Sequence, residues 1–220
     1  MNHPGDNASI PSVEHQHFIV KTLGSGDYQF TWQAMKSFTE HRNAETQDQI
    51  WLLQHPPVFT QGIAGKPEHV LNTHGIPLIK TDRGGQITYH GPGQIIAYLL
   101  LDIRRLRLTV RELVRSMEDA VIDVLESYHI VATGRIEAPG VYVGDAKIAA
   151  LGLKIRKNYC YHGIALNVDM DLTPFSYINP CGYKGLRVTQ IKDLNVNFTL
   201  EQVGSRLVDQ LQKKLLKRIS

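Results

Sequence analysis

A series of short alternating segments, separated by turn-forming dipeptides in the second half of the chain, limits the fold more than any other feature. The segments cover residues 140–143, 147–156 and 159–168, and the dipeptides Gly144-Asp145 and Lys157-Asn158 lie between them. Two-residue connections of this kind join antiparallel strands, because they suit tight hairpin turns. This half of the chain is therefore expected to form a β meander.

Hydrophobic periodicity predicts further strands and three helices elsewhere. The strands are expected over residues 17–23, 49–54, 76–80 and 94–102, with a loop or bent strand over 58–65. Helices are expected over residues 28–43 and 109–128, and a last helix is expected to begin after Thr199. Each helix has an N-terminal signal, namely Asp27, the capping box Thr109-Val110-Arg111-Glu112, and Thr199 followed by Gln202. Such residues accept hydrogen bonds from the free amides of a first turn.

The length of 220 residues, 42% of them hydrophobic, predicts one compact domain over residues 17–220. Residues 1–16 are polar, without the apolar core of a signal peptide or the arginines of a mitochondrial presequence. They are expected to be a flexible tail of a cytoplasmic protein. The longest apolar run, residues 95–101, is far shorter than the roughly 20 residues of a membrane helix. No membrane association is therefore expected.

Composition also bears on redox state and on partners. The chain has two cysteines and ten histidines but contains neither a CxxC nor an HExxH motif. Neither a disulfide framework nor a zinc site is expected, and a reducing cytosol would keep both thiols free. The net charge of +3 arises from 24 basic and 21 acidic residues and is too balanced to indicate a nucleic-acid-binding protein. Any basic character that matters must be local.

Lys147 and Cys181 are the candidates for a reactive pair. A free thiol is only a few per cent thiolate near neutral pH, so a nucleophilic cysteine needs a cation or a base beside it. Cys181 lies in the turn Asn179-Pro180-Cys181-Gly182, which can present a side chain at the mouth of a site. The structural alternatives are an unremarkable loop cysteine and a lysine at a solvated strand end. Cys160 lies within a strand segment and is expected to be a small buried hydrophobe.

The segment RGGQITYHGPG, residues 83–93, combines an arginine, a glycine pair and a short β run. Glycines let a backbone approach a ligand closely and leave amide donors uncovered. The segment is not a phosphate loop, because it lacks GxxxxGK[ST] and a following helix. Two hairpin turns in an antiparallel sheet are the structural alternative. His90 and His162 could each orient a partner or act as a base, or could be hydrogen-bonded structural histidines.

A cluster of basic residues surrounds the start of the helix expected over residues 109–128. It consists of Arg104, Arg105, Arg107, Arg111 and Arg115. A solvated helix face accounts for such a cluster in most proteins. The alternative is a docking site, because a basic patch attracts an acidic partner and accelerates encounter.

Five sequence blocks, in the same order, resemble the lipoyl(octanoyl) transferase family. They are HPPVFTQG at 55–62, RGGQITYHGPGQIIAYLLLD at 83–102, GVYVGDAKIAALGLKIR at 140–156, HGIALNVDMDL at 162–172 and INPCGYKGLRVTQ at 178–190. The similarity covers most of residues 17–210. The family more often has VDGAK and KIASLG where this chain reads VGDAK and KIAALG. The first departure lies in the turn before Lys147, and the second places Ala150 where the family has a serine, so that one hydroxyl is missing. Neither departure affects the nucleophile.

The resemblance implies an α/β fold of the α+β type, in which helices flank a mixed β-sheet, similar to the catalytic domain of biotin and lipoate protein ligases. It also implies transfer of octanoyl, or lipoyl, from acyl carrier protein to a lysine ε-amino group through a cysteine thioester. The acceptors would be lipoyl domains of 2-oxoacid dehydrogenase E2 subunits and the glycine-cleavage H protein. This would be the first step of endogenous protein lipoylation, carried out by a monomer without a metal or cofactor.

The same resemblance assigns the nucleophile to Cys181 and its activating lysine to Lys147. It assigns acyl-substrate binding to three segments, which comprise Arg83, Gly84, Gly85, Gln86, Ile87, Thr88, Tyr89, His90, Ala150, Leu151, Gly152, Gly163, Ile164 and Ala165. Backbone amides near Gly163 or Gly152 are expected to hold the developing oxyanion.

The small side chains that follow Lys147 are expected to leave room above the sheet. An apolar channel lined by Ala149, Ala150 and Ile164 could measure the length of an acyl chain, because each buried CH₂ contributes roughly 0.8 kcal/mol.

Two other functions remain open at the level of sequence. An ATP-dependent lipoate or biotin ligase would share the fold, but it would require ATP and would form no covalent enzyme intermediate. A catalytically silent binding module for lipoyl domains or nucleic acid would keep binding after Cys181→Ala and transfer no acyl group.

Overall fold

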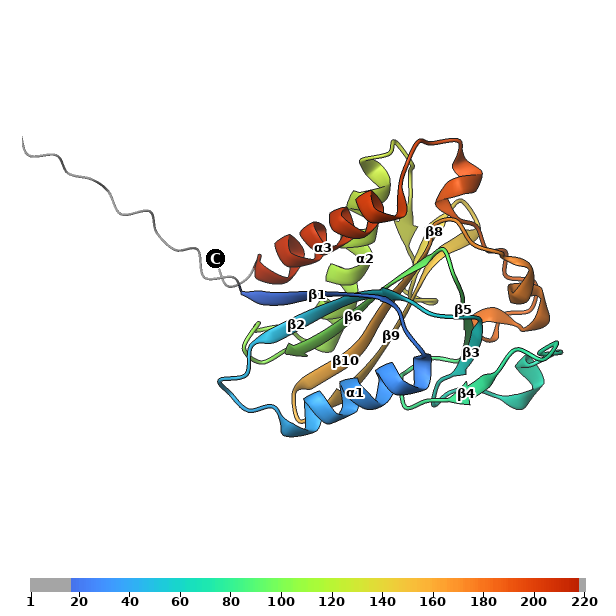
Figure 1. Cartoon of the computed structure of the whole chain (residues 1–220). Coiled ribbons are helices and arrows are strands. Elements are labelled where there is room, and N and C mark those ends of the chain that lie inside the picture. Colours follow the sequence, from blue (N-terminus) through green and yellow to red (C-terminus); the bar gives the residue numbers. More distant parts are fainter. Residues whose placement is uncertain (1–16, 218–220) are drawn as a thin grey trace, which may run out of the picture.

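The computed structural model describes residues 17–217 and contains a seven-stranded sheet (Figure 1). In spatial order the strands are β1 (Phe18–Ser25), β2 (Asp48–Gln54), β6 (Gln94–Asp102), β10 (Tyr159–Asn167), β9 (Ala146–Arg156), β8 (Val141–Val143) and β7 (Thr133–Gly134). Strands β1 and β2 are parallel, and every other neighbouring pair is antiparallel. The predicted mixed sheet and β meander are confirmed. The predicted tail, residues 1–16, lies outside the described residues.

Helices cover both faces of this sheet. Helix α1 (Tyr28–His41) lies on one face, and α2 (Val110–Glu126) and α3 (Leu200–Leu216) lie on the other (Figure 1). All three predicted helix starts are confirmed: the side chains of Asp27, Thr109 and Thr199 each accept a hydrogen bond from a first-turn amide. None of the helices between residues 17 and 217 is long and apolar enough to cross a membrane.

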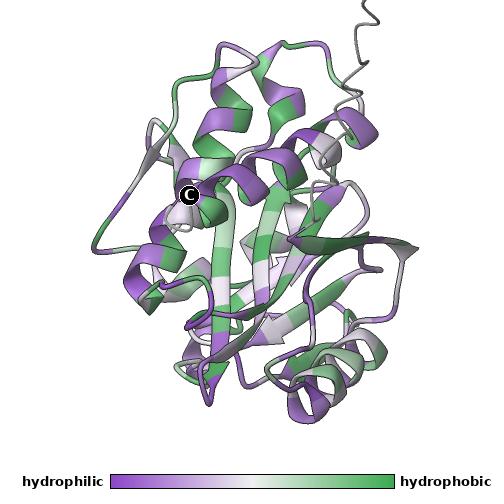
Figure 2. Ribbon diagram, turned by 90° about the vertical axis from the view of Figure 1, so that its left-hand side faces the viewer, coloured by the Kyte–Doolittle hydropathy of each residue, from purple (hydrophilic) through white to green (hydrophobic). Residues whose placement is uncertain are grey.

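The hydrophobic residues gather between the layers. Figure 2 shows hydrophobic residues along the strands, whereas hydrophobic and hydrophilic residues alternate along the helices. All nine residues of β6 are buried, as expected for a central strand. One core cluster joins the sheet to α2 and α3, and a second one joins it to α1. The middle of the sheet is therefore a rigid support for the residues at its edges.

A second, three-stranded sheet packs beside the first and has the order β4-β3-β5 (Figure 1). It consists of β3 (Val58–Gln61), β4 (Leu78–Lys80) and β5 (Ile87–His90). Residues 58–61, expected to be a loop or bent strand, form a regular strand, because Pro56 and Pro57 end β2 and let the chain start a new sheet. An aromatic cluster that includes Phe59, Tyr89 and Phe175 holds this sheet in place.

Short 3₁₀ turns also occur between the strands and helices of the described residues. They are Pro67–His69, Thr173–Tyr177, Pro180–Gly182 and Ile191–Leu194. The third of these contains Cys181 and is the turn that the sequence predicted.

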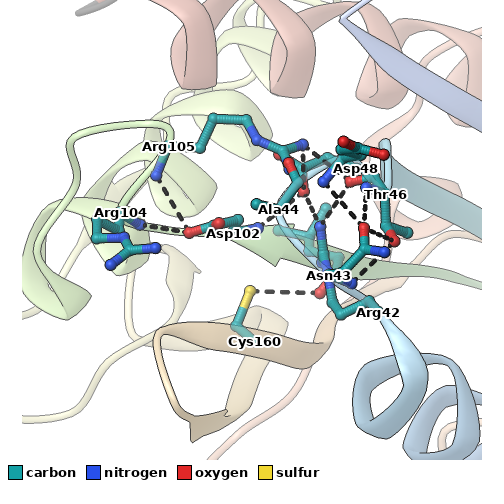
Figure 3. A network of polar contacts seen from close by, with 11 residues as sticks. Arg42, Asn43, Ala44, Thr46, Asp48, Asp102, Arg104, Arg105 and Cys160 are labelled. Carbon is teal, nitrogen blue, oxygen red and sulfur yellow. Dashed lines mark hydrogen bonds and ion pairs between the residues drawn. The ribbon is translucent and has the colours of Figure 1, made fainter.

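A buried ionic network closes the end of the sheet where β2 begins and β6 ends (Figure 3). The Arg42 guanidinium donates to the Asp48 carboxylate at 2.5 Å, and the two side chains are 0% and 2% exposed. Arg105 lies 3.6 Å from the same carboxylate and donates to the carbonyls of Ala44 and Thr46. Arg105 thus anchors the loop before β2, so the predicted basic cluster contains at least one arginine with a structural role.

Candidate active site

The side chains of Lys147 and Cys181 meet although 34 residues separate them. Nζ of Lys147 lies 3.0 Å from Sγ of Cys181 and 3.1 Å from the carbonyl oxygen of Pro139. Lys147 is only 4% exposed, so it is not the solvated strand end of the structural alternative. Cys181 is half-buried. The geometry provides the cation that a nucleophilic cysteine needs.

Backbone pairing explains how two distant segments reach this contact. The amide of Lys147 donates to the carbonyl of Arg187 at 2.8 Å, and the amide of Thr189 donates to the carbonyl of Lys147 at 3.0 Å. Residues 187–189 therefore lie along the start of β9 and bring the preceding turn with them. Periodicity does not reveal such a pairing, because it joins a strand to an irregular segment.

The turn at Cys181 has an unusual backbone. Cys181 has φ 55° and ψ 17°, and Gly182 follows with φ 80°. This positive φ favours glycine at 182, and a Cβ there would also lie 2.5 Å from Nε2 at the end of the Gln86 side chain, so the turn lies close to the loop after Arg83. Left-handed conformations at residues other than glycine are costly and often occur at functional sites.

The charge state of Lys147 depends on its partner. Burial by itself disfavours the ammonium form, but the adjacent Cys181 outweighs it, so the pKa of Lys147 is raised above its ordinary value. The amine also lies 5.2 Å from the ring centroid of Tyr142, which favours a cation further. Lys147 is therefore an ammonium ion whenever the thiolate is present.

Both groups lie in the wall of a cavity of about 380 Å³, within the range of small-molecule sites. Strand β8 pairs with β9 only as far as Ala149, so the rest of β9 has a strand neighbour on one side only. Residues 150–153 of this part of β9 line the cavity, and the first turns of α2 contribute Val110 and Val114 to its wall. It is a mostly apolar site with Lys147 and Cys181 in its lining.

Thirteen of the fourteen residues assigned to substrate segments line this cavity. They are Arg83, Gly84, Gly85, Gln86, Ile87, Thr88, His90, Ala150, Leu151, Gly152, Gly163, Ile164 and Ala165. Tyr89 is the exception, because its ring packs against Phe59 and Phe175 in the core of the small sheet. Ala149, expected in the channel, is also absent from the wall and lies in the main core, since alternate residues of a strand face opposite sides.

Arg83 shapes the loop that forms one wall. Its guanidinium is buried and donates to the carbonyls of Thr60, Gly84 and Gln86 at 2.6, 3.0 and 2.9 Å. With these acceptors satisfied, the side chain holds the glycine-rich loop in place. The amide of Gly84 in turn donates to the carbonyl of Leu153 at 2.8 Å, which ties the loop to the open edge of β9.

His90 and His162 both line the cavity and both have hydrogen-bond partners, as the structural alternative required. His90 contacts Gln94 and Thr60, and burial holds its pKa well below the usual value. His162 contacts Asp82 at 3.1 Å, and burial lowers its pKa as well. Both imidazoles are therefore neutral near pH 7.

The cavity wall also contains residues that were not predicted as site residues, among them Tyr28 and Tyr98. Tyr28, the first residue of α1, is buried and also lines the cavity. Tyr98 lies in a strand whose residues are all apolar or aromatic apart from its two ends. The backbone of His162 has φ 64°, which no sequence pattern indicates. The three residues come from α1, β6 and β10, and only the packing of these elements brings them to one cavity.

The presence of glycine at 163 does not by itself support the predicted oxyanion role of the nearby backbone amides. Gly163 pairs with Gly152 on one side and with Tyr98 on the other, and a Cβ there would lie 2.0 Å from the carbonyl oxygen of Ala97. Close strand packing is therefore sufficient reason for glycine at 163.

Among residues 17–217, no three His, Cys, Asp or Glu side chains are placed to hold a metal ion.

Cys160 has the environment of a core residue. It is fully buried, and burial raises the pKa of its thiol to about 12. A thiol in that state is a poor nucleophile. The interpretation of Cys160 as a small hydrophobe is confirmed.

The model for the "Lipoyl protein ligase A/B catalytic domain" matches residues 27–212. A protein named octanoyltransferase from Nitrosomonas europaea is 64% identical over 196 residues, which cover 89% of this chain and 96% of that protein. The octanoyltransferase of Chromobacterium violaceum is 58% identical over 197 residues, covering 90% of this chain and 95% of that one.

Solved structures with lower identity share the fold. A lipoate-protein ligase A bound with ATP has a TM-score of 0.76 at 17% identity, over 91% of this chain and 86% of that one. A biotin protein ligase from Aquifex aeolicus has a TM-score of 0.58 at 13% identity, over 92% and 72%. The predicted fold is confirmed. Because the family model spans most of the chain, and the relatives are similar over nearly their whole length, this chain belongs to the lipoyl protein ligase A/B catalytic domain family.

Proposed function

We propose that this protein transfers octanoyl to a lysine of lipoyl-bearing proteins and that Cys181 carries the acyl group between donor and acceptor. The contact between Lys147 and Cys181 at the wall of an apolar cavity is the observation that carries the proposal. The names of the relatives support the acyl group and the reaction class. The substrate-binding roles of the cavity residues are part of the same proposal.

In the first half-reaction, the Cys181 thiolate attacks the carbonyl carbon of an octanoyl thioester on acyl carrier protein. A new carbon–sulfur bond forms to Cys181, and the bond to the carrier thiol breaks. The Lys147 ammonium gives its proton to the departing thiolate and becomes a neutral amine. Exchange of one thioester for another needs no ATP, since the two bonds are similar in free energy.

In the second half-reaction, the neutral ε-amine of the acceptor lysine attacks the acyl-Cys181 carbonyl. The amide bond forms, the bond to the Cys181 sulfur breaks, and the proton lost by the attacking nitrogen goes to Lys147. The ammonium and thiolate are thereby restored. One lysine thus serves as acid in the first step and as base in the second.

The proposed donor is an acyl carrier protein, and the proposed acceptors are lipoyl domains of 2-oxoacid dehydrogenase E2 subunits and the glycine-cleavage H protein. The exposed arginines Arg104, Arg107 and Arg111 support an acidic donor, because Arg111 adjoins Val110 in the cavity wall. Both cysteines are unpaired, which suits a reducing cytoplasm.

Intact mass after incubation with octanoyl-acyl carrier protein tests the proposal. The wild-type protein should gain one octanoyl group, Cys160→Ala should gain it as well, and Cys181→Ala should not. An ATP-dependent ligase would instead require free acid and ATP and would show no covalent adduct. Absence of the adduct in the wild-type protein would exclude the proposed mechanism.

A further inference from the structure

One peptide unit lies between the reactive lysine and a buried carboxylate. The amide of Gly140 donates to Oε1 of Glu118 at 2.9 Å. The carbonyl of Pro139, which belongs to the same peptide bond, accepts from Nζ of Lys147 at 3.1 Å. In a trans peptide the N–H and C=O groups point in opposite directions. The Glu118 carboxylate and the Lys147 ammonium therefore hold this peptide from its two sides.

Glu118 is unusual for a charged residue. It lies in the middle of α2, and it is only 6% exposed. Glutamate is seldom buried unless a partner satisfies it, because loss of hydration is costly. No salt bridge to Glu118 occurs within residues 17–217, and its one side-chain hydrogen bond there is the one to Gly140. The hydrogen bond from the Gly140 amide is thus the specific interaction that compensates for the burial of Glu118.

Gly140 makes the close approach possible. Its φ is 148°, a value that favours glycine. A Cβ at this position would lie 2.8 Å from Cε and 2.9 Å from Nζ of Lys147, and 2.9 Å from the carbonyl oxygen of Ala149. A side chain here would therefore displace the lysine amine from Cys181 or push β9 away.

We propose that Glu118 is a positioning residue for Lys147, acting through the Pro139–Gly140 peptide, and this inference rests on the proposed function of the Lys147 and Cys181 pair. With the peptide fixed, its carbonyl takes one N–H bond of the ammonium and leaves another directed at Sγ of Cys181. Without the Glu118 acceptor the peptide loses its anchor on α2, and the amine loses its fixed direction. Glu118 does not touch substrate.

Two substitutions separate the hydrogen bond from the charge. Glu118→Gln keeps an oxygen that accepts from Gly140, so it should keep most of the wild-type rate. Glu118→Ala removes the acceptor, so kcat should fall on the order of 10²-fold, as a misplacement of about 1 Å can cause, with little change in KM. Glu126→Ala, an exposed glutamate at the end of the same helix, is the matched control and should leave both parameters unchanged.

A second measurement does not depend on acyl transfer. The rate of Cys181 alkylation by iodoacetamide reports the thiolate, and Cys160 should not react in the folded protein because it is fully buried. In Glu118→Ala the pH profile of alkylation should move to higher pH, whereas Glu118→Gln should keep the wild-type profile. Gly140→Ala should reproduce the shift while Glu118 is intact, and it provides the test if Glu118→Ala fails to fold.

The outcomes distinguish this inference from the proposed function. If wild-type protein forms no acyl-enzyme, the proposed function fails, whatever the variants do. If wild-type protein forms it and the folded Glu118→Ala variant keeps the wild-type kcat and alkylation profile, the positioning role is wrong. Equal impairment of Glu118→Gln and Glu118→Ala would also overturn it, because the hydrogen bond would then not be the cause.

Discussion

Nζ of Lys147 and Sγ of Cys181 lie 3.0 Å apart, and each is fixed by a different part of the fold. Lys147 is the second residue of β9 in the main sheet, and Cys181 lies in a 3₁₀ turn. Residues 187–189, which follow that turn, form backbone hydrogen bonds with Lys147 and so hold the turn beside β9. A charged pair in a half-buried site interacts more strongly than it would in water. The reactivity of the cysteine should therefore depend directly on this lysine.

Replacement of the lysine should disable both half-reactions. Lys147→Met keeps most of the volume and removes the charge and the transferable proton, so acyl transfer should fall by about 10²- to 10⁴-fold. Stopped-flow or quenched assays of acyl-enzyme formation measure the loss. Lys213→Met, on the exposed face of α3, is the control and should behave as wild type. A wild-type rate in Lys147→Met would show that the lysine does not activate Cys181.

The cavity should select acyl chains by length. Ala165 lines it and pairs with Ala150 on β9 and with Ile96 on β6. Ala165→Leu should fill part of the space, so that octanoyl loses about 0.8 kcal/mol for each CH₂ that no longer fits, while hexanoyl loses less. Transfer rates with hexanoyl and octanoyl carriers give the ratio. An unchanged ratio in a folded variant would mean that the chain does not lie against Ala165.

The ionic network at the far end of the sheet should matter for stability rather than for activity (Figure 3). Asp48→Ala leaves the Arg42 guanidinium buried without its partner, which should lower the free energy of unfolding by about 3–5 kcal/mol. Urea denaturation measures this change. Glu68→Ala, which breaks an exposed pair with Lys66, should leave the midpoint where it is. Equal effects of the two variants would contradict this account.

Three buried histidines should make the protein sensitive to mild acid. Burial lowers the pKa of His55, His90 and His162, whereas an unfolded histidine binds a proton near pH 6.5. Below about pH 6.5 the unfolded chain therefore holds more protons, so the free energy of unfolding decreases as pH falls from 7.5 to 5.5. His90→Asn should make this decrease smaller, and replacement of the exposed His129 by asparagine should not.

The docking surface for the donor should comprise only the free arginines of the predicted cluster. Arg105 is held by Asp48 and two carbonyls, and Arg115 is paired with Asp119 at 3.2 Å. Reversal of Arg104, Arg107 and Arg111 to glutamate should raise KM for carrier-bound octanoyl at low salt and leave a small thioester donor unaffected. Lys213→Glu reverses a charge on the exposed face of α3, away from this surface, and should leave KM unchanged. An unchanged KM would assign the arginines to ordinary surface.

Local patterns in the sequence specify most of the framework. Capping residues such as Thr109 and Thr199 define helix starts, and the alternation around Gly144 defines the meander, because both depend on neighbours within a few residues. The small sheet was only partly predicted, since residues 58–61 pair with residues 19 to 32 positions away in the sequence. The same limit explains Tyr89, whose ring packs into the small sheet instead of the cavity.

The sequence by itself determined most of the secondary structure, the family resemblance, and the identity of the candidate lysine and cysteine. Only the tertiary structure decided that these two side chains touch, that Tyr28 and Tyr98 reach the cavity, and that Glu118 holds the peptide behind Lys147. The physical reason is the range of the interactions. Caps and turns are set by adjacent residues, whereas contacts across 20 or more residues exist only after the sheets have packed and buried their common core.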